Sequence, residues 1–465
     1  MRKIKILEDK IYSKIIFWGA SFLLLLMPLH PFLMMSLRHF LGLPQIIQAW
    51  KELLIFGLFC FFVAKQFKEK NFSSWDIIDK AIFLYFFIAF FSVLINKITP
   101  LQAIFGAKYD LEFLLLFLII KNTQFEKDAY EKILNFYFAI FALVILFGFL
   151  QTFFFPVNFL INFGYSPVDA FWGHSADRGG KIPAVWNDFG IPRTFSFISS
   201  PNSFGFFVAI GIFFLIFYLI FSKEKQKNKK IFVIFLLILA AICLAYSFSR
   251  SAWLGFFIAS IFGFGLIFYL SKIFHEKYNK IIFYFLLASS VFLIMFLSLF
   301  LKYNLFDKKN FQLIFLHGSY HRETGISGST KAHLESFKRF NFWEESFWGK
   351  IIGIGLGKVN AAATNFKNGY SVESWYFQVL GEMGILGFLT YLSIIFLIFY
   401  FLLHFLPEID FKNITGILIL GVLTGFSVMT TASFFIPAWF DSSNTLPFWT
   451  LAGFAFSYLK EKEIL

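Results

Sequence analysis

The chain has few charged residues and almost no cysteine. Asp, Glu, Lys and Arg make up only 15% of its 465 residues, whereas soluble domains average roughly 25%. A soluble fold of this length would have to hide the apolar remainder in one core, and the ratio of surface to volume does not allow this. Its two cysteines, Cys60 and Cys243, lie inside apolar runs. They are expected to face lipid or protein, so the sequence predicts neither a disulfide nor a cysteine metal site.

Apolar side chains dominate instead. They form 58% of the chain, and 76 residues are Phe. Many apolar runs approach or exceed about 18 residues, the length that crosses the hydrocarbon layer of a membrane. The sequence therefore predicts an all-α fold, a polytopic transmembrane helical bundle of about twelve spans. The expected spans lie near 14–36, 46–64, 81–96, 104–120, 133–155, 203–222, 231–248, 252–270, 281–301, 376–403, 414–433 and 440–459.

Polar residues interrupt two of these spans. Three charges, Lys108, Asp110 and Glu112, stand in the fourth, which is expected to be a half-span or a tilted helix. Asp441 and Pro447 break the last one. The first span follows a basic segment but is longer than a signal-peptide core and has no small-residue cleavage site, so it is expected to stay in the protein.

The basic residues predict the orientation. The net charge is +13, but the Lys residues stand in short clusters between apolar runs, as in cytoplasmic loops that face anionic lipid. No nucleic-acid partner is therefore expected. With the N-terminus in the cytoplasm and the long loop 302–372 set aside, 23 basic residues lie inside and 8 outside. This bias predicts a multi-pass protein of the cytoplasmic (inner) membrane with both termini in the cytoplasm.

Two long loops are then expected on the outer face, at about 156–202 and 302–372, and they contain most of the polar residues. Long loops often carry function. We divide the chain into an N-terminal part with the first long loop (1–202), a core with the second (203–400), and C-terminal helices (401–465).

Arg250 is the first candidate for chemistry. It lies in the sequence SRSAWLG, between two spans that leave no room for a loop. An arginine near the hydrocarbon boundary is costly unless it pairs or faces a polar cavity. The alternative is an interfacial anchor whose charge reaches the head groups.

Arg193 precedes another span. Pro201 and Asn202 are typical of a helix start, and free N–H groups there, with Arg193 nearby, would favour an anion. The alternative is an ordinary capped helix with a solvated arginine. Lys108 is a third outer basic residue close to the membrane.

Two acidic residues lie at the tenth span. Glu373 stands at its mouth and Glu382 lies inside it, and acidic residues at these depths need partners. The alternative for Glu382 is a structural hydrogen bond to a neighbouring helix. The glycine-rich run 353–358 lacks the strand-to-helix context of a phosphate loop, so no nucleotide site is expected. His317 and His321 have no further ligands nearby in sequence, so no metal site is expected.

Taken together, these segments resemble the superfamily of O-antigen ligases and O-antigen polymerases. The resemblance runs from about Trp50 to the end of the chain and is strongest between Arg193 and Gly387. Its motifs are RTF with SPNSFG at 193–205, SRSAWLG at 249–255, STKAHL at 329–334, GIGLG at 353–357, and ESWYFQ with GEMGILG at 373–387.

The resemblance implies a membrane glycosyltransferase that acts on sugars linked to a polyprenyl diphosphate, with its active site on the outer face. It implies catalytic roles for Arg193, Arg250 and Glu373. It also implies substrate-binding roles for four further residues: Lys108, Asn202, His333 and Glu382. No metal or other cofactor is implied. The expected partners are the lipid-linked glycan donor, a glycan or lipid acceptor and membrane lipids, with a flippase or a chain-length regulator as possible protein partners.

One departure from the family pattern concerns the residue that would activate the acceptor. Ligases of this superfamily carry a His at the start of the tenth span, where this chain has Glu373 and Ser374. This form resembles the polymerase-like branch, with the ligase as the alternative. A transporter or flippase of lipid-linked sugars is the alternative from another class, although it would need polar residues along a path through the bilayer. A structural assembly protein that only recruits partners is a third hypothesis.

Overall fold

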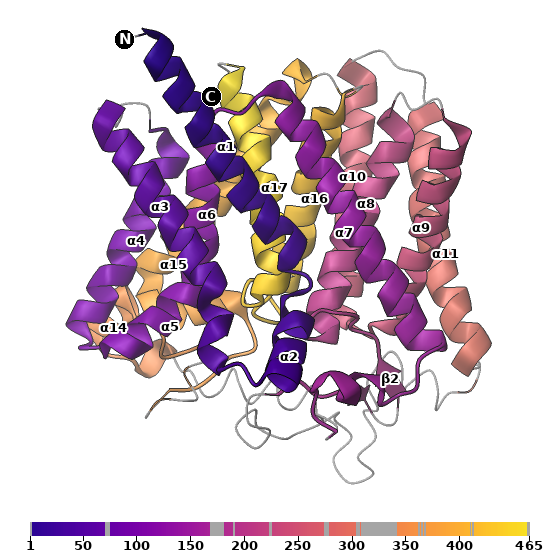
Figure 1. Ribbon diagram of the computed structural model, residues 1–465, viewed down its shortest axis with the longest axis horizontal. Helices are drawn as coiled ribbons and strands as arrows, with labels where there is room; N and C mark the ends of the chain where they lie inside the picture. The colour runs from indigo at the N-terminus through magenta and orange to yellow at the C-terminus, as the bar shows by residue number, and fades with distance from the viewer. Residues whose placement is uncertain are drawn as a thin grey trace.

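The protein is a bundle of helices with one short β-hairpin (Figure 1). The computed structural model describes residues 2–69, 75–167, 181–188, 191–222, 226–273, 279–303, 307, 342–360, 363, 366, 369–409, 411 and 413–462. Its α-helices are α1 (Arg2–Leu26), α2 (His30–Leu41), α3 (Trp50–Glu69), α4 (Ile77–Ile95), α5 (Pro100–Asp110), α6 (Glu112–Lys121), α7 (Lys127–Phe153), α8 (Pro201–Phe221), α9 (Lys227–Tyr246), α10 (Arg250–Ile273), α11 (Asn279–Tyr303), α14 (Phe347–Ile352), α15 (Trp375–His404), α16 (Ile414–Ala432) and α17 (Ser442–Glu461).

Short elements join them. The 3-10 helices are η1 (Gln45–Ala49), η3 (Phe159–Phe163), η5 (Phe342–Glu344) and η7 (Leu406–Glu408). Strands β1 (Trp186–Asp188) and β2 (Ile191–Arg193) pair antiparallel, with Trp186 opposite Arg193. The hairpin therefore fixes the backbone of Arg193 just before α8.

The predicted helical membrane class is confirmed, but the count of about twelve spans is not. Among the described residues, nine helices are long and apolar enough to cross a membrane, or ten if α1 and α2, which are bent by 76° relative to each other, form one broken span. The expected fourth span breaks at Leu111 into α5 and α6, and α6 has only 10 residues. The expected last span forms α17, which is long enough but too polar to meet the same criterion.

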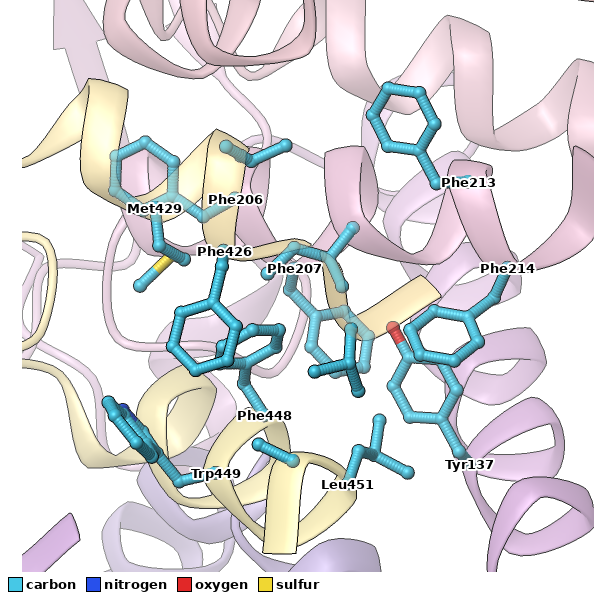
Figure 2. Close-up of a cluster of buried hydrophobic side chains, with 14 of the residues drawn as sticks. Tyr137, Phe206, Phe207, Phe213, Phe214, Phe426, Met429, Phe448, Trp449 and Leu451 are labelled. Carbon is cyan, nitrogen blue, oxygen red and sulfur yellow. The ribbon is translucent and has the colours of Figure 1, made fainter. Parts of the chain in front are cut away.

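The core of the bundle is built from aromatic side chains. Helices α8 and α16 are the most enclosed candidate spans, with 83% and 78% of their most apolar windows buried. A helix that is apolar on every side, as α8 is, belongs inside a bundle. Figure 2 shows α8 side chains beside those of α7, α16 and α17; ring centroids of Phe426 and Phe448 are 4.8 Å apart, and those of Tyr137 and Phe214 are 4.9 Å apart.

The two ends of the bundle differ. Both termini lie at one end, whereas α2, α5, α14 and the β-hairpin lie at the other (Figure 1). We call the second the loop end. Helices α8, α10, α15 and α17 all begin at the loop end, so the N-terminal residues of these helices lie in the same region of the molecule.

Candidate functional site

Arg193 links three segments at the loop end. Its Nε donates to the carbonyl of Ser247 at 2.9 Å, and its Nη2 donates to Oδ1 of Asn202 at 2.8 Å. The backbone N–H of the next residue, Thr194, donates to the carbonyl of Tyr246 at 2.9 Å. The half-buried guanidinium is therefore held between the start of α8 and the end of α9.

The start of α8 differs in detail from the expectation. The helix begins at Pro201 as predicted, but its cap is Ser200, whose side chain accepts from the backbone N–H of Ser203. Asn202 is not the cap. Its side-chain oxygen accepts from Arg193 instead, so Asn202 orients the guanidinium.

Arg250 begins α10, and only three residues separate it from the end of α9. Close helix contacts fix this position, because a Cβ added to Gly205 of α8 would lie 2.8 Å from the Cβ of Ala252 and 3.0 Å from the hydroxyl of Ser247. Ser247, which accepts from Arg193, thus lies in the short turn that leads into Arg250. Two of the predicted arginines therefore share one structural neighbourhood.

Glu373 lies at the start of α15, which is docked on the end of α16. Ser374 Oγ and the backbone N–H of Trp375 both donate to the carbonyl of Ser433, at 3.1 and 3.0 Å. Helix α16 in turn packs along α10, where a Cβ on Gly255 would lie 2.8 Å from the carbonyl oxygen of Val428. Helix α16 therefore connects the segment of Glu373 to the helix that begins with Arg250, and the Glu373 side chain is half-buried.

Glu382 lies at a break in α15. Gly384 has non-helical backbone angles (φ 63°, ψ −166°), so α15 consists of two helices joined at this residue. The glycine-rich loop at 353–357 fills the break: Gly355 N–H donates to the carbonyl of Glu382 at 3.3 Å, and the hydroxyl of Ser92 in α4 donates to the same oxygen at 2.6 Å. The glycine run thus supports a broken helix.

The Glu382 side chain meets a second buried carboxyl group, Asp110 at the end of α5. One oxygen of each group has a donor: the Val359 N–H donates to Glu382 Oε1 at 2.9 Å, and Gln378 Nε2 donates to Asp110 Oδ1 at 2.7 Å. The other oxygens, Oε2 and Oδ2, have no donor from a different group. Both residues are fully buried. Two carboxyl groups that meet in an apolar interior repel each other when both are ionised, so we expect the pair to keep one proton.

Lys108 belongs to a separate ion cluster. Its Nζ lies 2.8 Å from Glu52 Oε1, and the buried Lys51 lies 2.5 Å from the same oxygen and 3.7 Å from Glu112 Oε2. The side chain of Tyr109 stacks on Phe440 with centroids 4.2 Å apart. Lys108 is thus already neutralised by a carboxylate.

The structure therefore brings some of the predicted residues together and not others. Arg193 and Asn202 are in direct contact, and Arg250 shares their neighbourhood. Glu382 in α15 meets Asp110 of α5, whereas Lys108 of α5 belongs to a different polar cluster. His333, His317 and His321 lie outside the described residues, and so does part of each long loop. Among the described residues no group of three or more His, Cys, Asp or Glu side chains could hold a metal ion.

Sequence reasoning missed three features of the loop end. Asp110 appeared only as an interruption of a span, although it is the partner of Glu382. Lys51 and Glu52 directly follow Trp50, where the resemblance begins, and were given no role. Asp441 appeared as a helix breaker, yet it caps α17 through Ser443 N–H at 2.9 Å and accepts a hydrogen bond from Ser199. Charges at the edges of apolar runs were the available signal in each case.

The fold defines a multi-pass helical membrane protein, and the polar clusters described above lie at its loop end. Residues 235–392 match a protein-family model described as O-antigen ligase. The match confirms the resemblance to the O-antigen ligase and polymerase superfamily; it includes Arg250, Glu373 and Glu382, while Arg193, Asn202 and Lys108 precede it. No curated protein matches the chain.

Proposed function

We propose that the protein is a membrane glycosyltransferase that uses a polyprenyl-diphosphate-linked oligosaccharide to polymerise a surface glycan on the outer side of the inner membrane. The observation that carries this proposal is the Arg193 network: a guanidinium held by Asn202 and by the carbonyl of Ser247, three residues before Arg250. The O-antigen ligase match at 235–392 supports a glycosyltransferase of this type.

The two arginines act on the leaving group. When the glycosidic bond breaks, negative charge develops on the diphosphate of the polyprenyl carrier. A guanidinium presents a planar fork of donors that fits phosphate oxygens. Arg193 at the end of β2 and Arg250 at the start of α10 neutralise that charge. Preorganised donors of this kind supply a large part of a rate enhancement.

Glu373 acts on the acceptor. The acceptor hydroxyl attacks the anomeric carbon, its proton passes to the Glu373 carboxylate, and the bond from the anomeric carbon to the diphosphate oxygen breaks. The half-buried position at the start of α15 suits a base that must reach a sugar at the membrane surface. The energy comes from the lipid diphosphate, so this mechanism uses no nucleotide.

The test is a turnover assay of purified protein with a lipid-diphosphate oligosaccharide, with and without chelator. Arg193→Ala and Arg250→Ala are expected to lower turnover at least about a hundredfold, and Lys at either position to restore little because it lacks the fork. Loss of activity in the presence of chelator contradicts the metal-free mechanism. Full activity of Arg250→Ala would favour the alternative in which Arg250 is an interfacial anchor.

The same assay tests the base. Glu373→Gln is expected to lower turnover about a hundred- to ten-thousand-fold, with donor binding nearly unchanged, and Glu373→His to recover part of it. The exposed Glu344, at the end of η5, provides a matched control in Glu344→Gln. Turnover of Glu373→Gln equal to that of Glu344→Gln removes the proposed role.

The second candidate is a ligase that transfers the glycan to a lipid or protein acceptor. The superfamily match is described as O-antigen ligase, whereas Glu373 in place of a His favours the polymerase. Products distinguish the two: a polymerase gives a ladder of longer lipid-linked glycans, and a ligase gives a single transfer to a separate acceptor. Net movement of an intact lipid-linked sugar, without a new glycosidic bond, would instead indicate a flippase.

A further inference from the structure

An open pocket lies at the loop end. It has a volume of about 600 Å³, open solvent included, between α2, the turn after it, and two later segments. The described residues that line it are Met35, Arg38, His39, Gly42, Leu43, Gly164 and Lys181. None of these described residues is acidic and three are basic, which favours an anion.

One donor in this pocket has no partner. Nη1 of Arg38 is buried and makes no hydrogen bond with the described residues. An unpaired buried donor is unfavourable, and more so when the group is charged. A ligand oxygen in the pocket would remove this cost.

Backbone contacts fix the segments that carry these basic residues. Gly42, with φ 62°, ends α2, and its N–H donates to the carbonyl of Arg38. Gly164 packs closely on α2, since a Cβ there would lie 2.6 Å from the Cβ of His39. Lys181 precedes Ile182, whose carbonyl accepts from Ser166 N–H at 2.8 Å. Two distant parts of the chain thus bring basic residues to one pocket, where the side chains of His39 and Lys181 are exposed.

The helix end alone does not explain this arrangement. Arg38 and His39 lie in the last turn of α2, where cations favour the negative end of the helix dipole. That effect applies to two of the three basic residues. It accounts neither for Lys181, which comes from beyond α7, nor for the unpartnered nitrogen of Arg38.

The surroundings of the pocket are apolar. Helix α2 departs from the axis of α1 by 76°, and the side chains that follow Arg38 face outward: Phe40 is 63%, Leu41 64% and Ile46 79% exposed. Exposed apolar side chains on a helix that turns away from the bundle axis are typical of the membrane interface. Phosphate groups of lipids lie at that depth.

We propose that this pocket binds the phosphate group of a membrane lipid, with Arg38, His39 and Lys181 as its ligands. The site is separate from Arg193 and Arg250 and does not depend on the proposed glycosyl transfer. Its occupant is either a phospholipid of the bilayer or a lipid-linked phosphate, because both present the same chemistry.

Native mass spectrometry of the purified full-length protein tests the site. Phosphatidylglycerol is the probe, and a glycolipid with the same acyl chains but no phosphate is the reference. Arg38→Gln combined with Lys181→Gln is expected to weaken phosphatidylglycerol binding at least about tenfold, as loss of charged hydrogen bonds predicts, and to leave the glycolipid unchanged. Lys97→Gln, which alters an exposed cation between α4 and α5, is the matched control.

Competition identifies the source of the phosphate. If polyprenyl diphosphate displaces phosphatidylglycerol from the wild type and does not bind the double variant, the site takes a lipid-linked phosphate. If it displaces no phosphatidylglycerol from the wild type, the site takes a bilayer phospholipid. Equal phosphatidylglycerol binding in the wild type and the double variant overturns the proposal, and so does an equal loss of the phosphate-free glycolipid. A thermal unfolding curve establishes that the variants are folded.

Discussion

Arg193 shows how one side chain can join helices that are far apart in sequence. Its Nε donates to Ser247, the residue that follows α9, and its Nη2 donates to Asn202 at the start of α8. These two hydrogen bonds orient the guanidinium between the two helices.

Asn202→Ala removes one of these acceptors without changing the net charge. We expect the KM for the lipid-linked donor to rise about tenfold, because a hydrogen bond to a charged group contributes about 1.5–3 kcal/mol. Turnover at saturating donor should fall less. Steady-state kinetics of the purified protein measure both, and an unchanged KM would show that Asn202 does not position Arg193.

Glu382 provides a second prediction for single residues. In Glu382→Gln, the amide oxygen still accepts from Val359 N–H and the amide N–H donates to Asp110 without a shared proton. We expect thermal stability close to that of the wild type. Glu382→Ala leaves two buried groups without partners and is expected to cost about 2–4 kcal/mol. Equal melting temperatures of the two variants in detergent would contradict the carboxyl pair.

The sequence predicted part of this residue-scale picture. A charged side chain in apolar surroundings is costly. Arginines at span boundaries are therefore candidates for function, and Arg193 and Arg250 were predicted on this basis. The pairing of Asp110 with Glu382 spans 272 positions, and no local pattern encodes a contact between helices so far apart. At Glu382 the side chain accepts from Val359 N–H and the backbone carbonyl accepts from Ser92 of α4, and its role in binding substrate stays a prediction.

At the scale of elements, the break in α15 depends on glycine. Gly384 has φ 63°, and a Cβ there would lie 2.4 Å from the carbonyl carbon of Ile351. Gly353, with φ 86°, is equally close to the backbone of Glu382. Side chains at either position would separate the loop from the helix.

Gly384→Ala is therefore expected to be destabilising by several kcal/mol, since a strained φ costs roughly 1–2 kcal/mol and the contact adds to it. Gly265→Ala in α10 is the control, because a Cβ there meets nothing within 4 Å. Alanine should be neutral or slightly stabilising at that helical position. Thermal unfolding of both variants measures the difference, and similar melting temperatures would argue against a rigid break.

Hydropathy identified the long helices but not the bend in the first. An apolar run looks the same whether the backbone continues through it or turns, so 14–36 was expected as one span. In 104–120, the charges of Lys108, Asp110 and Glu112 predicted a half-span or a tilted helix. The structure bends the first between α1 and α2 and interrupts the second at Leu111. Packing against other segments decides such breaks.

For the whole molecule, the charge bias predicts which end faces the cytoplasm. Both termini lie at one end and the candidate site at the other (Figure 1). After replacement of the exposed Cys60, a cysteine at Lys97 should react with a membrane-impermeant maleimide in intact cells. A cysteine at Lys132, near the opposite end, should react only after permeabilisation. The reverse pattern would refute the orientation and an outward-facing active site.

The break in α15 also has a consequence for biogenesis. Its first part, residues 375–383, is about 14 Å long and its second part, residues 385–404, about 30 Å. Only the second matches the hydrocarbon thickness, so the insertion machinery has one adequate segment to recognise. Residues 375–383 reach their place by folding against protein, where the hydroxyl of Ser92 in α4 donates to the Glu382 carbonyl. Because α4 is synthesised nearly three hundred residues earlier, the site around Glu373 is completed only when late and early parts of the chain meet.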